Sequence, residues 1–212
     1  MTAVMRLLLD TAETNVWKTL APQGVFSGIT TNPLLMKRAG MACSIDNYAR
    51  LLERAQALNY SEIHFQVFGD NWAACAEKIL SLGPRVFVKV PAVAAGLSVV
   101  NGLNCPERVT LTAIYSPSQI MQAEALGVAY AAPYYARLHE KSGNADPEFQ
   151  IMRQIEQNTR VLVASLRSIE QIEHLAQMGF RTFAIPGALA LEWTEHSFSL
   201  AAINEFEDAA GG

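Results

Sequence analysis

The stretch Arg85-Val86-Phe87-Val88-Lys89-Val90-Pro91 decides how the rest of the sequence is interpreted. Its valines alternate with Phe87 and Lys89, which is the period of two that a β-strand shows, and its final proline ends the strand. Burial disfavours the charged ammonium and lowers the pKa of a lysine, whereas an unperturbed lysine with a pKa of about 10.4 is almost wholly protonated at neutral pH. Lys89 is therefore either a buried nucleophile for a carbonyl carbon or a strand-end lysine whose ammonium group reaches into water.

The composition is that of a globular protein with a large core. The chain has 212 residues, of which 50% are hydrophobic and 17% are charged, and its mean hydropathy is +0.14. Such a chain can bury a substantial apolar core, and α/β barrels often span about 200 to 250 residues as one unit. We therefore expect a single domain over residues 1–212.

Charge and hydropathy argue against two classes of partner. A net charge of −4 and an isoelectric point near 5.6 offer no basic surface for nucleic acid. No apolar run reaches the roughly 18 residues of a membrane span, and Arg6 and Asp10 interrupt the N-terminal apolar segment that a signal peptide would need. We expect a cytoplasmic protein that binds neither nucleic acid nor membranes.

The cysteines and histidines predict no metal site. Cys43, Cys75 and Cys105 are widely spaced without a CxxC pair, and the four histidines are equally scattered. This distribution argues against a disulfide framework and against zinc. HExxH, GxGxxG, P-loop and GxSxG motifs do not occur, which disfavours metallohydrolase and dinucleotide chemistry.

Short apolar runs of strand type alternate with longer segments of helical period along the chain. The expected strands cover residues 6–9, 25–31, 62–67, 85–91, 109–112, 128–132, 160–164 and 182–185. The expected helices cover a segment opening at 33 and residues 13–20, 45–58, 72–82, 92–100, 116–126, 147–157 and 168–178, with an additional helix at about 196–209. Eight strand-and-helix units favour a closed (β/α)₈ TIM barrel, with an open doubly wound sheet as the alternative.

Polar side chains stand at nearly every expected strand end. In such barrels the chemistry lies at the C-terminal ends of the strands. One polar strand end means little, because loops begin there, but a set that includes a lysine predicts a concave polar site. The ends carry Asp10, Thr31-Asn32, Gln66, Lys89, Thr112, Pro133-Tyr134, Ser165 to Arg167 and Pro186.

Several short motifs together resemble the small transaldolase family, in particular its fructose-6-phosphate aldolase branch. The resemblance runs from about residue 5 to the C-terminus, and the combination of TTNP with VKVP is its most specific part. Segments 139–147 and 186–193 match the family poorly. The motifs are Leu9-Asp10-Thr11, Gly28-Ile29-Thr30-Thr31-Asn32-Pro33, Val88-Lys89-Val90-Pro91, Thr112-Ala113-Ile114-Tyr115, Ala132-Pro133-Tyr134 and Ala164-Ser165.

The resemblance implies that Lys89 is a Schiff-base nucleophile. Its amine would attack C2 of fructose 6-phosphate, and the iminium would accept electrons when the bond between C3 and C4 breaks. Glyceraldehyde 3-phosphate then leaves, and the remaining dihydroxyacetone unit is either released or passed to a second aldose phosphate. Neither reaction needs a metal or an organic cofactor.

The resemblance also implies roles for nine further residues. Asp10 and Asn32 match positions that hold the dihydroxyacetone hydroxyls, and Thr30 matches a neighbour for which packing is an equally good role. A second group, which positions a water molecule and moves protons, consists of Gln66, Thr112 and Tyr134. A third group consists of Arg137, Ser165 and Arg167. It suits a terminal phosphate because arginine binds two oxygens at once. At position 167 aldolase relatives can carry lysine.

Gln66 and Tyr134 favour the aldolase over the transaldolase. In the resemblance, transaldolases tend to carry a glutamate at position 66 and a phenylalanine near position 134, whereas the aldolase branch carries glutamine and tyrosine. A carboxylate could act directly as a base on water, whereas the amide of Gln66 can only orient it and leaves proton transfer to the tyrosine.

Two further hypotheses are a barrel that binds sugar phosphates without turnover and a lysine-dependent aldolase for deoxyribose phosphate or keto acids.

The helix expected at residues 196–209 bears on assembly. Phe198, Ala201, Ala202 and Phe206 lie on one side of it. In related proteins such a helix packs on a neighbouring subunit of a ring-shaped pentamer, and pentamers can pair to decamers. We therefore expect a homo-oligomer, with a helix that docks on its own barrel as the alternative.

Overall fold

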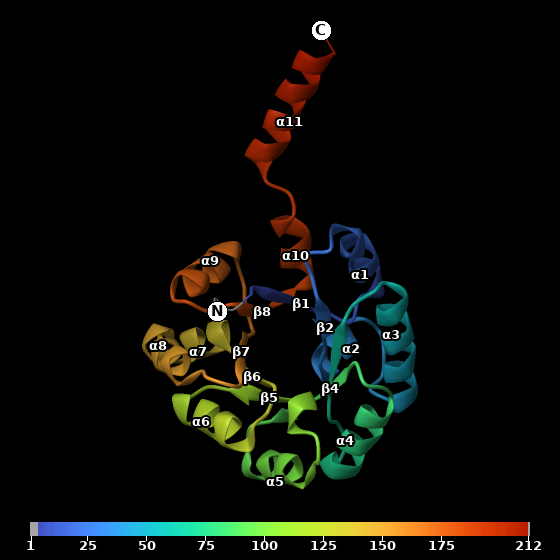
Figure 1. The fold of residues 1–212 in the computed structure, drawn as a ribbon, viewed down its shortest axis with the longest axis vertical. Coiled ribbons are helices and arrows are strands. Elements are labelled where there is room, and N and C mark those ends of the chain that lie inside the picture. The colour runs from blue at the N-terminus through green and yellow to red at the C-terminus, as the bar shows by residue number, and fades with distance from the viewer. Residues whose placement is uncertain (1–3, 212) are drawn as a thin grey trace.

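The computed structural model describes residues 4–211 and confirms the TIM barrel. Eight parallel strands close into a barrel in sequence order, and helices surround it (Figure 1). The strands are β1 (Arg6–Asp10), β2 (Gly28–Thr30), β3 (Glu62–Gln66), β4 (Val86–Pro91), β5 (Val109–Ile114), β6 (Tyr130–Pro133), β7 (Arg160–Val163) and β8 (Thr182–Pro186).

The helices follow the strands as the alternating pattern predicts. They are α1 (Thr14–Leu20), α2 (Pro33–Arg38), α3 (Ile45–Ala57), α4 (Trp72–Ser81), α5 (Ala94–Gly102), α6 (Pro117–Leu126), α7 (Tyr135–Ser142), α8 (Asp146–Ile155), α9 (Ile169–Gln177), α10 (Gly187–Trp193) and α11 (Ser197–Ala210). Two 3₁₀ turns, Ala21–Gln23 and Pro106–Arg108, complete the elements.

The largest differences from the sequence prediction concern α7, α10 and β2. The helices α7 and α10 are additional to it; α10 begins directly after β8, and a single residue, Tyr134, separates β6 from α7, so no loop marks their start. The strand β2 begins at Gly28 rather than at Val25, because residues 21–23 form a 3₁₀ turn and Gly24 follows with a φ of 66° in the left-handed region.

The alternation in β4 separates its two faces as expected. Val86, Val88 and Val90 are fully buried and belong to the core between the sheet and the surrounding helices. Phe87 packs against a smaller, separate cluster of buried side chains, which fills the barrel interior around Leu8, Tyr130 and Leu162. Because side chains alternate along a strand, Lys89 also points into the barrel, and it is only 5% exposed.

The N-terminal half of the barrel interior holds a polar network. Glu62 accepts hydrogen bonds from Arg6 Nε at 2.9 Å and from the hydroxyl of Tyr130 at 3.0 and 3.1 Å. The ring nitrogen Nδ1 of His64 lies 2.9 Å from Thr110 Oγ1. These bonds satisfy polar groups that burial would otherwise destabilise. The exception is His64 Nε2, which has no hydrogen-bond partner among residues 4–211 and lies 3.6 Å from Glu62 Oε2. The polar residues at every second position of β3 are the sequence signal for this network.

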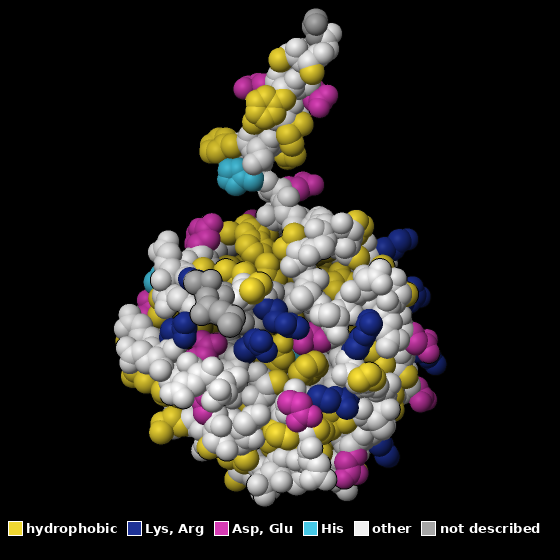
Figure 2. Space-filling model, viewed as in Figure 1, with side chains coloured by type: hydrophobic (Ala, Val, Ile, Leu, Met, Phe, Trp, Pro, Cys, Tyr) yellow, Lys and Arg dark blue, Asp and Glu magenta, His cyan; other side chains and the backbone are white. Residues whose placement is uncertain are grey.

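The helix α11 projects away from the barrel (Figure 1). None of its side chains is buried, and Phe198 and Phe206 are 79% and 68% exposed. Figure 2 shows its hydrophobic side chains in yellow along the projecting segment. Within residues 4–211, no helix combines the length and the apolar character that crossing a membrane requires.

Candidate active site

A cavity at the C-terminal ends of the strands brings together eight of the ten predicted site residues. It encloses about 30 Å³, which is space on the scale of one or two water molecules. Its lining consists of Asp10, Thr30, Asn32, Lys89, Thr112, Ala132, Tyr134, Arg137, Leu162, Ala164, Ser165 and Ala184.

Lys89 is held inside this cavity. Its Nζ donates a hydrogen bond to Thr30 Oγ1 at 2.6 Å. Burial lowers the pKa of Lys89, and the negative charge of Asp10 opposes part of that shift. The neutral amine that a nucleophile requires is therefore more populated here than on a lysine in water.

Asp10 ends β1, where it lies in register with Thr30. Burial raises the pKa of the Asp10 carboxyl, while the charges of Lys89 and Arg137 lower it. A carboxylate with a raised pKa is a better proton acceptor than an ordinary aspartate.

Thr112 and Tyr134 form a hydrogen-bonded pair beside the lysine. Their oxygens are 2.9 Å apart. Burial raises the pKa of the Tyr134 phenol, although the hydrogen bond with Thr112 and the charge of Arg137 act in the opposite direction. The phenol consequently carries its proton at neutral pH and can donate it.

A β-bulge directly follows Thr112, which lies in the cavity wall. The pairing of β5 with β6 shifts register between Thr112 and Ile114, and the residue between them, Ala113, has a φ of 57°. Such bulges redirect a side chain and are common next to active sites.

Asn32 is fixed by its role at the start of α2. Its Oδ1 accepts hydrogen bonds from the backbone N–H groups of Leu34 and Leu35, which is an N-cap. With that oxygen engaged, the side-chain amide of Asn32 has only N–H groups to offer a ligand, and these suit a sugar hydroxyl as acceptor.

Ser165 and Arg137 form the side of the cavity suited to an anion. Ser165 has a φ of 59°, which is strained for a residue other than glycine, and its buried Oγ has no hydrogen-bond partner among residues 4–211. Arg137 lies on α7 with its Cζ 4.7 Å from the centre of the Tyr134 ring. A hydroxyl and a guanidinium in this arrangement can bind a phosphate group.

Two predicted residues do not line the cavity. Gln66 is half-buried at the end of β3 beside Lys89, and its backbone oxygen accepts a hydrogen bond from Tyr48 at 2.9 Å. Arg167 is exposed and forms an ion pair with Glu140 at 3.6 Å, outside the cavity. Both residues were correctly predicted to lie at or just after the end of a strand. A position at a strand end does not by itself determine where the side chain points.

Tyr115, the last residue of the motif Thr112-Ala113-Ile114-Tyr115, is an aromatic neighbour of the site. It contacts Tyr134 edge to face, with ring centres 5.6 Å apart, and the ammonium group of Lys141 lies 4.9 Å from the centre of the Tyr115 ring. Tyr115 therefore holds the Tyr134 ring in place. Among the residues that the structure describes, no group of three or more His, Cys, Asp or Glu side chains could hold a metal ion.

Comparison with protein families and curated sequences gives one consistent result. Residues 7–210 match the family described as transaldolase/fructose-6-phosphate aldolase. A protein named probable transaldolase from Pelotomaculum thermopropionicum is 29% identical over 95% of both chains. Another of the same name from Streptococcus pyogenes is 26% identical over 95% of this chain and 96% of its own.

Solved structures with a similar shape support the barrel. An HpcH/HpaI aldolase/citrate lyase family protein from Burkholderia cenocepacia has a TM-score of 0.66 at 13% identity, covering 99% of this chain and 95% of its own. An N-acetylmannosamine-6-phosphate 2-epimerase from Clostridium perfringens has a TM-score of 0.61 at 10% identity, covering 96% of this chain and 93% of its own. At such identities the similarity establishes the fold alone.

Proposed function

Because the chain belongs to the transaldolase/fructose-6-phosphate aldolase family of Schiff-base enzymes, we propose that it is the aldolase: it cleaves fructose 6-phosphate reversibly to dihydroxyacetone and glyceraldehyde 3-phosphate. The family acts on sugar phosphates, and the finer assignment concerns which of its two reactions this chain performs. Proposed roles for the cavity residues follow from their positions.

The proposed reaction begins at Lys89. Its neutral amine attacks C2 of the ketose, and loss of water gives an iminium. Asp10 accepts the proton of the C4 hydroxyl, the bond between C3 and C4 breaks, and its electron pair moves into the iminium to form an enamine. Glyceraldehyde 3-phosphate leaves. Protonation of the enamine carbon and addition of water then release dihydroxyacetone and regenerate the amine.

The observation that carries this assignment is the 2.9 Å contact between Thr112 and Tyr134 in the same cavity as Lys89. Release of dihydroxyacetone needs a proton donor for the enamine and a group that assists attack by water. Tyr134 has a raised pKa and therefore keeps a proton to give. A phenylalanine, which the resemblance ascribes to transaldolases near position 134, lacks that proton.

The transaldolase reaction is the second candidate. The relatives from Pelotomaculum thermopropionicum and Streptococcus pyogenes carry the name probable transaldolase. In that reaction the enamine on Lys89 attacks the aldehyde of a second sugar phosphate instead of taking up a proton. The transferred unit would pass between sugars such as sedoheptulose 7-phosphate and glyceraldehyde 3-phosphate.

Borohydride trapping tests the proposal. The protein is incubated with fructose 6-phosphate and borohydride, and the adduct is located by mass spectrometry of peptides. A dihydroxyacetone adduct on Lys89 supports the shared mechanism, and the absence of an adduct or its location on another lysine contradicts it. Release of free dihydroxyacetone without an acceptor then supports the aldolase. If the dihydroxyacetone unit leaves Lys89 only when erythrose 4-phosphate is added, and is found joined to that acceptor, the aldolase assignment is contradicted.

We further propose that the protein is a homo-oligomer assembled through α11. The helix presents Phe198, Ile203 and Phe206 to solvent, and these side chains are more than half exposed. Exposed apolar side chains clustered on one projecting helix are typical of an interface. A pentamer or decamer, as the family resemblance implies, would cover them.

A further inference from the structure

A second pocket lies at the opposite end of the barrel from Lys89. It encloses about 350 Å³, a size typical of small-molecule sites. Its walls come from the N-terminal ends of β1, β7 and β8 and from α8. The lining residues are Val4, Met5, Arg6, Ser27, Arg153, Glu156, Arg160, Gly179, Arg181 and Thr182.

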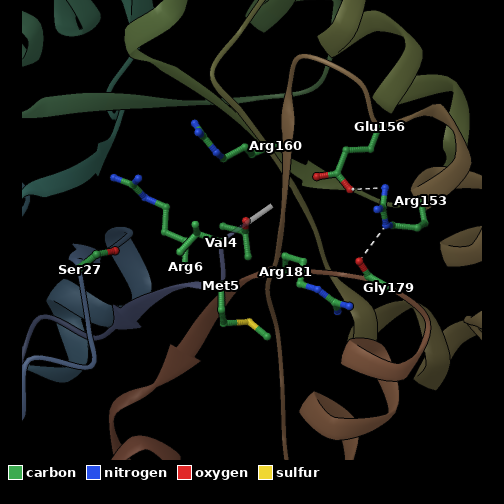
Figure 3. A pocket seen from close by; sticks show the side chains of 10 residues that line it. Val4, Met5, Arg6, Ser27, Arg153, Glu156, Arg160, Gly179 and Arg181 are labelled. Carbon is green, nitrogen blue, oxygen red and sulfur yellow. Dashed lines mark hydrogen bonds and ion pairs between the residues drawn. The ribbon is translucent and has the colours of Figure 1, made fainter. Parts of the chain in front are cut away.

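Four arginines surround this pocket on a protein whose net charge is −4. Figure 3 shows Arg6 and Arg160 on one side of Val4 and Met5, and Arg153 and Arg181 on the other. The face turned to the viewer in Figure 2 also carries dark-blue Lys and Arg side chains near its middle. The concentration of positive charge in one concavity attracts an anion.

Two of the arginines are held in place by backbone carbonyls. Arg153 Nε donates to the carbonyl of Gly179 at 2.9 Å. Arg181 Nη1 donates to the carbonyls of Ala176 and Phe180, each at 2.8 Å. Fixed guanidinium groups lose little conformational entropy when they bind a ligand.

The other two arginines have donors to spare. Within the described part of the chain, Arg6 uses only its Nε, in the bond to Glu62. Arg160 is exposed, lies with its Cζ 6.0 Å from the centre of the Tyr130 ring, and donates no side-chain hydrogen bond among residues 4–211. A guanidinium has five N–H groups, so both can donate further hydrogen bonds into the pocket.

Two carboxylates oppose an anion and limit its charge. Glu156 lines the pocket and pairs with Arg153 at 3.2 Å. Glu62 lies behind Arg6. Four guanidinium groups therefore exceed the carboxylates by two, which matches the charge of about −2 that a phosphate monoester carries near neutral pH.

We propose that this pocket is a second ligand site, which binds a small phosphorylated metabolite. Its four arginines line one concavity, and the N–H groups that Arg6 and Arg160 leave free are donors of the kind that phosphate oxygens accept. The volume leaves room for a short carbon chain beyond the phosphate. The N-terminal face of such barrels ordinarily serves stability. A purely structural role for these arginines predicts no bound ligand, which separates the two interpretations.

The test is calorimetric titration of the full chain with glycerol 3-phosphate at low salt. The expected result is two sites per chain, because the proposed active site also binds phosphate. Arg137→Ala should remove one site, and Arg160→Gln should weaken the other about tenfold while leaving aldol turnover unchanged. Lys78→Gln, which removes a positive charge from the exposed face of α4, is the matched control and should change neither site.

Three results would overturn the proposal. The first is a single site that Arg137→Ala abolishes and Arg160→Gln leaves intact. The second is equal weakening by Arg160→Gln and Lys78→Gln, since this would reflect general charge alone. The third is binding of inorganic phosphate at the second site without binding of glycerol 3-phosphate, because the pocket would then recognise only the inorganic ion.

Discussion

Lys89 on β4 donates a hydrogen bond to Thr30 on β2 at 2.6 Å, across the mouth of a barrel in which β3 separates the two strands. The contact fixes the position of Nζ. The acceptor is a neutral hydroxyl rather than a carboxylate, so the bond places no negative charge directly against the amine. Thr30 is 1% exposed, and the pair is therefore shielded from water. This environment favours the unprotonated amine.

Lys89→Met should abolish turnover and stabilise the fold. The folded-state pKa of Lys89 lies below the ordinary value of 10.5, so between these two pKa values the unfolded chain binds more protons and stability rises with pH. Methionine removes this penalty, and we expect a gain of about 0.5 to 2 kcal/mol in unfolding free energy. Urea unfolding at several pH values measures it. Lys78→Met, at an exposed position of α4, is the control. A loss of stability in Lys89→Met would contradict the prediction.

Asp10→Asn should move the pH dependence of Schiff-base formation to lower pH. The Asp10 carboxylate raises the pKa of Lys89 against the larger effect of burial. Its removal therefore lets the pKa fall further, so the neutral amine appears at lower pH. The rate of borohydride trapping at saturating dihydroxyacetone, measured against pH, gives the midpoint. Asp46→Asn on exposed α3 should leave it unchanged, and an upward shift in Asp10→Asn would refute the assignment.

The sequence was sufficient to predict those parts of the site that depend on the alternation of side chains along a strand and of strands with helices along the chain. The valines around Lys89 determine which way it points, and the βα order determines which strand ends meet. The φ of 59° at Ser165 could not be predicted, because serine rarely adopts it and no glycine or asparagine marks the position. Arg137 lies on the additional helix α7, and the outward position of Arg167 depends on the loop after β7.

Tyr134→Phe should impair release of dihydroxyacetone more than its transfer. The change keeps the ring packed against Tyr115 but removes the hydroxyl that bonds to Thr112. Loss of a general acid costs about 10² to 10⁴ in rate. Cleavage without an acceptor should fall by this factor, while transfer to erythrose 4-phosphate should fall less. Tyr115→Phe, which keeps the same aromatic contact, is the control. Equal losses in both reactions of Tyr134→Phe would contradict the proposed role.

Arg137→Ala should weaken the use of phosphorylated aldehydes selectively. A charge-assisted hydrogen bond contributes about 1.5 to 3 kcal/mol, which is roughly 10- to 100-fold in kcat/KM. We expect this loss for synthesis from dihydroxyacetone and glyceraldehyde 3-phosphate, and little change with unphosphorylated glyceraldehyde. Arg167→Ala provides a comparison, since Arg167 is exposed and paired with Glu140, and its effect should be smaller. A similar loss with both aldehydes would instead indicate that Arg137 supports Tyr134 by packing.

Phe206→Glu should dissociate the proposed oligomer without unfolding the barrel. Phe206 is 68% exposed on α11, so a charge there costs little in an isolated chain, but it must be desolvated where the helix packs against another subunit. Analytical ultracentrifugation at micromolar concentration should show the wild type as an assembly and the variant as smaller species, with the same unfolding transition for the barrel. Asn204→Glu places the same charge on the other side of α11 and should preserve the assembly. A monomeric wild type would remove the basis for the prediction, because α11 would then need no partner.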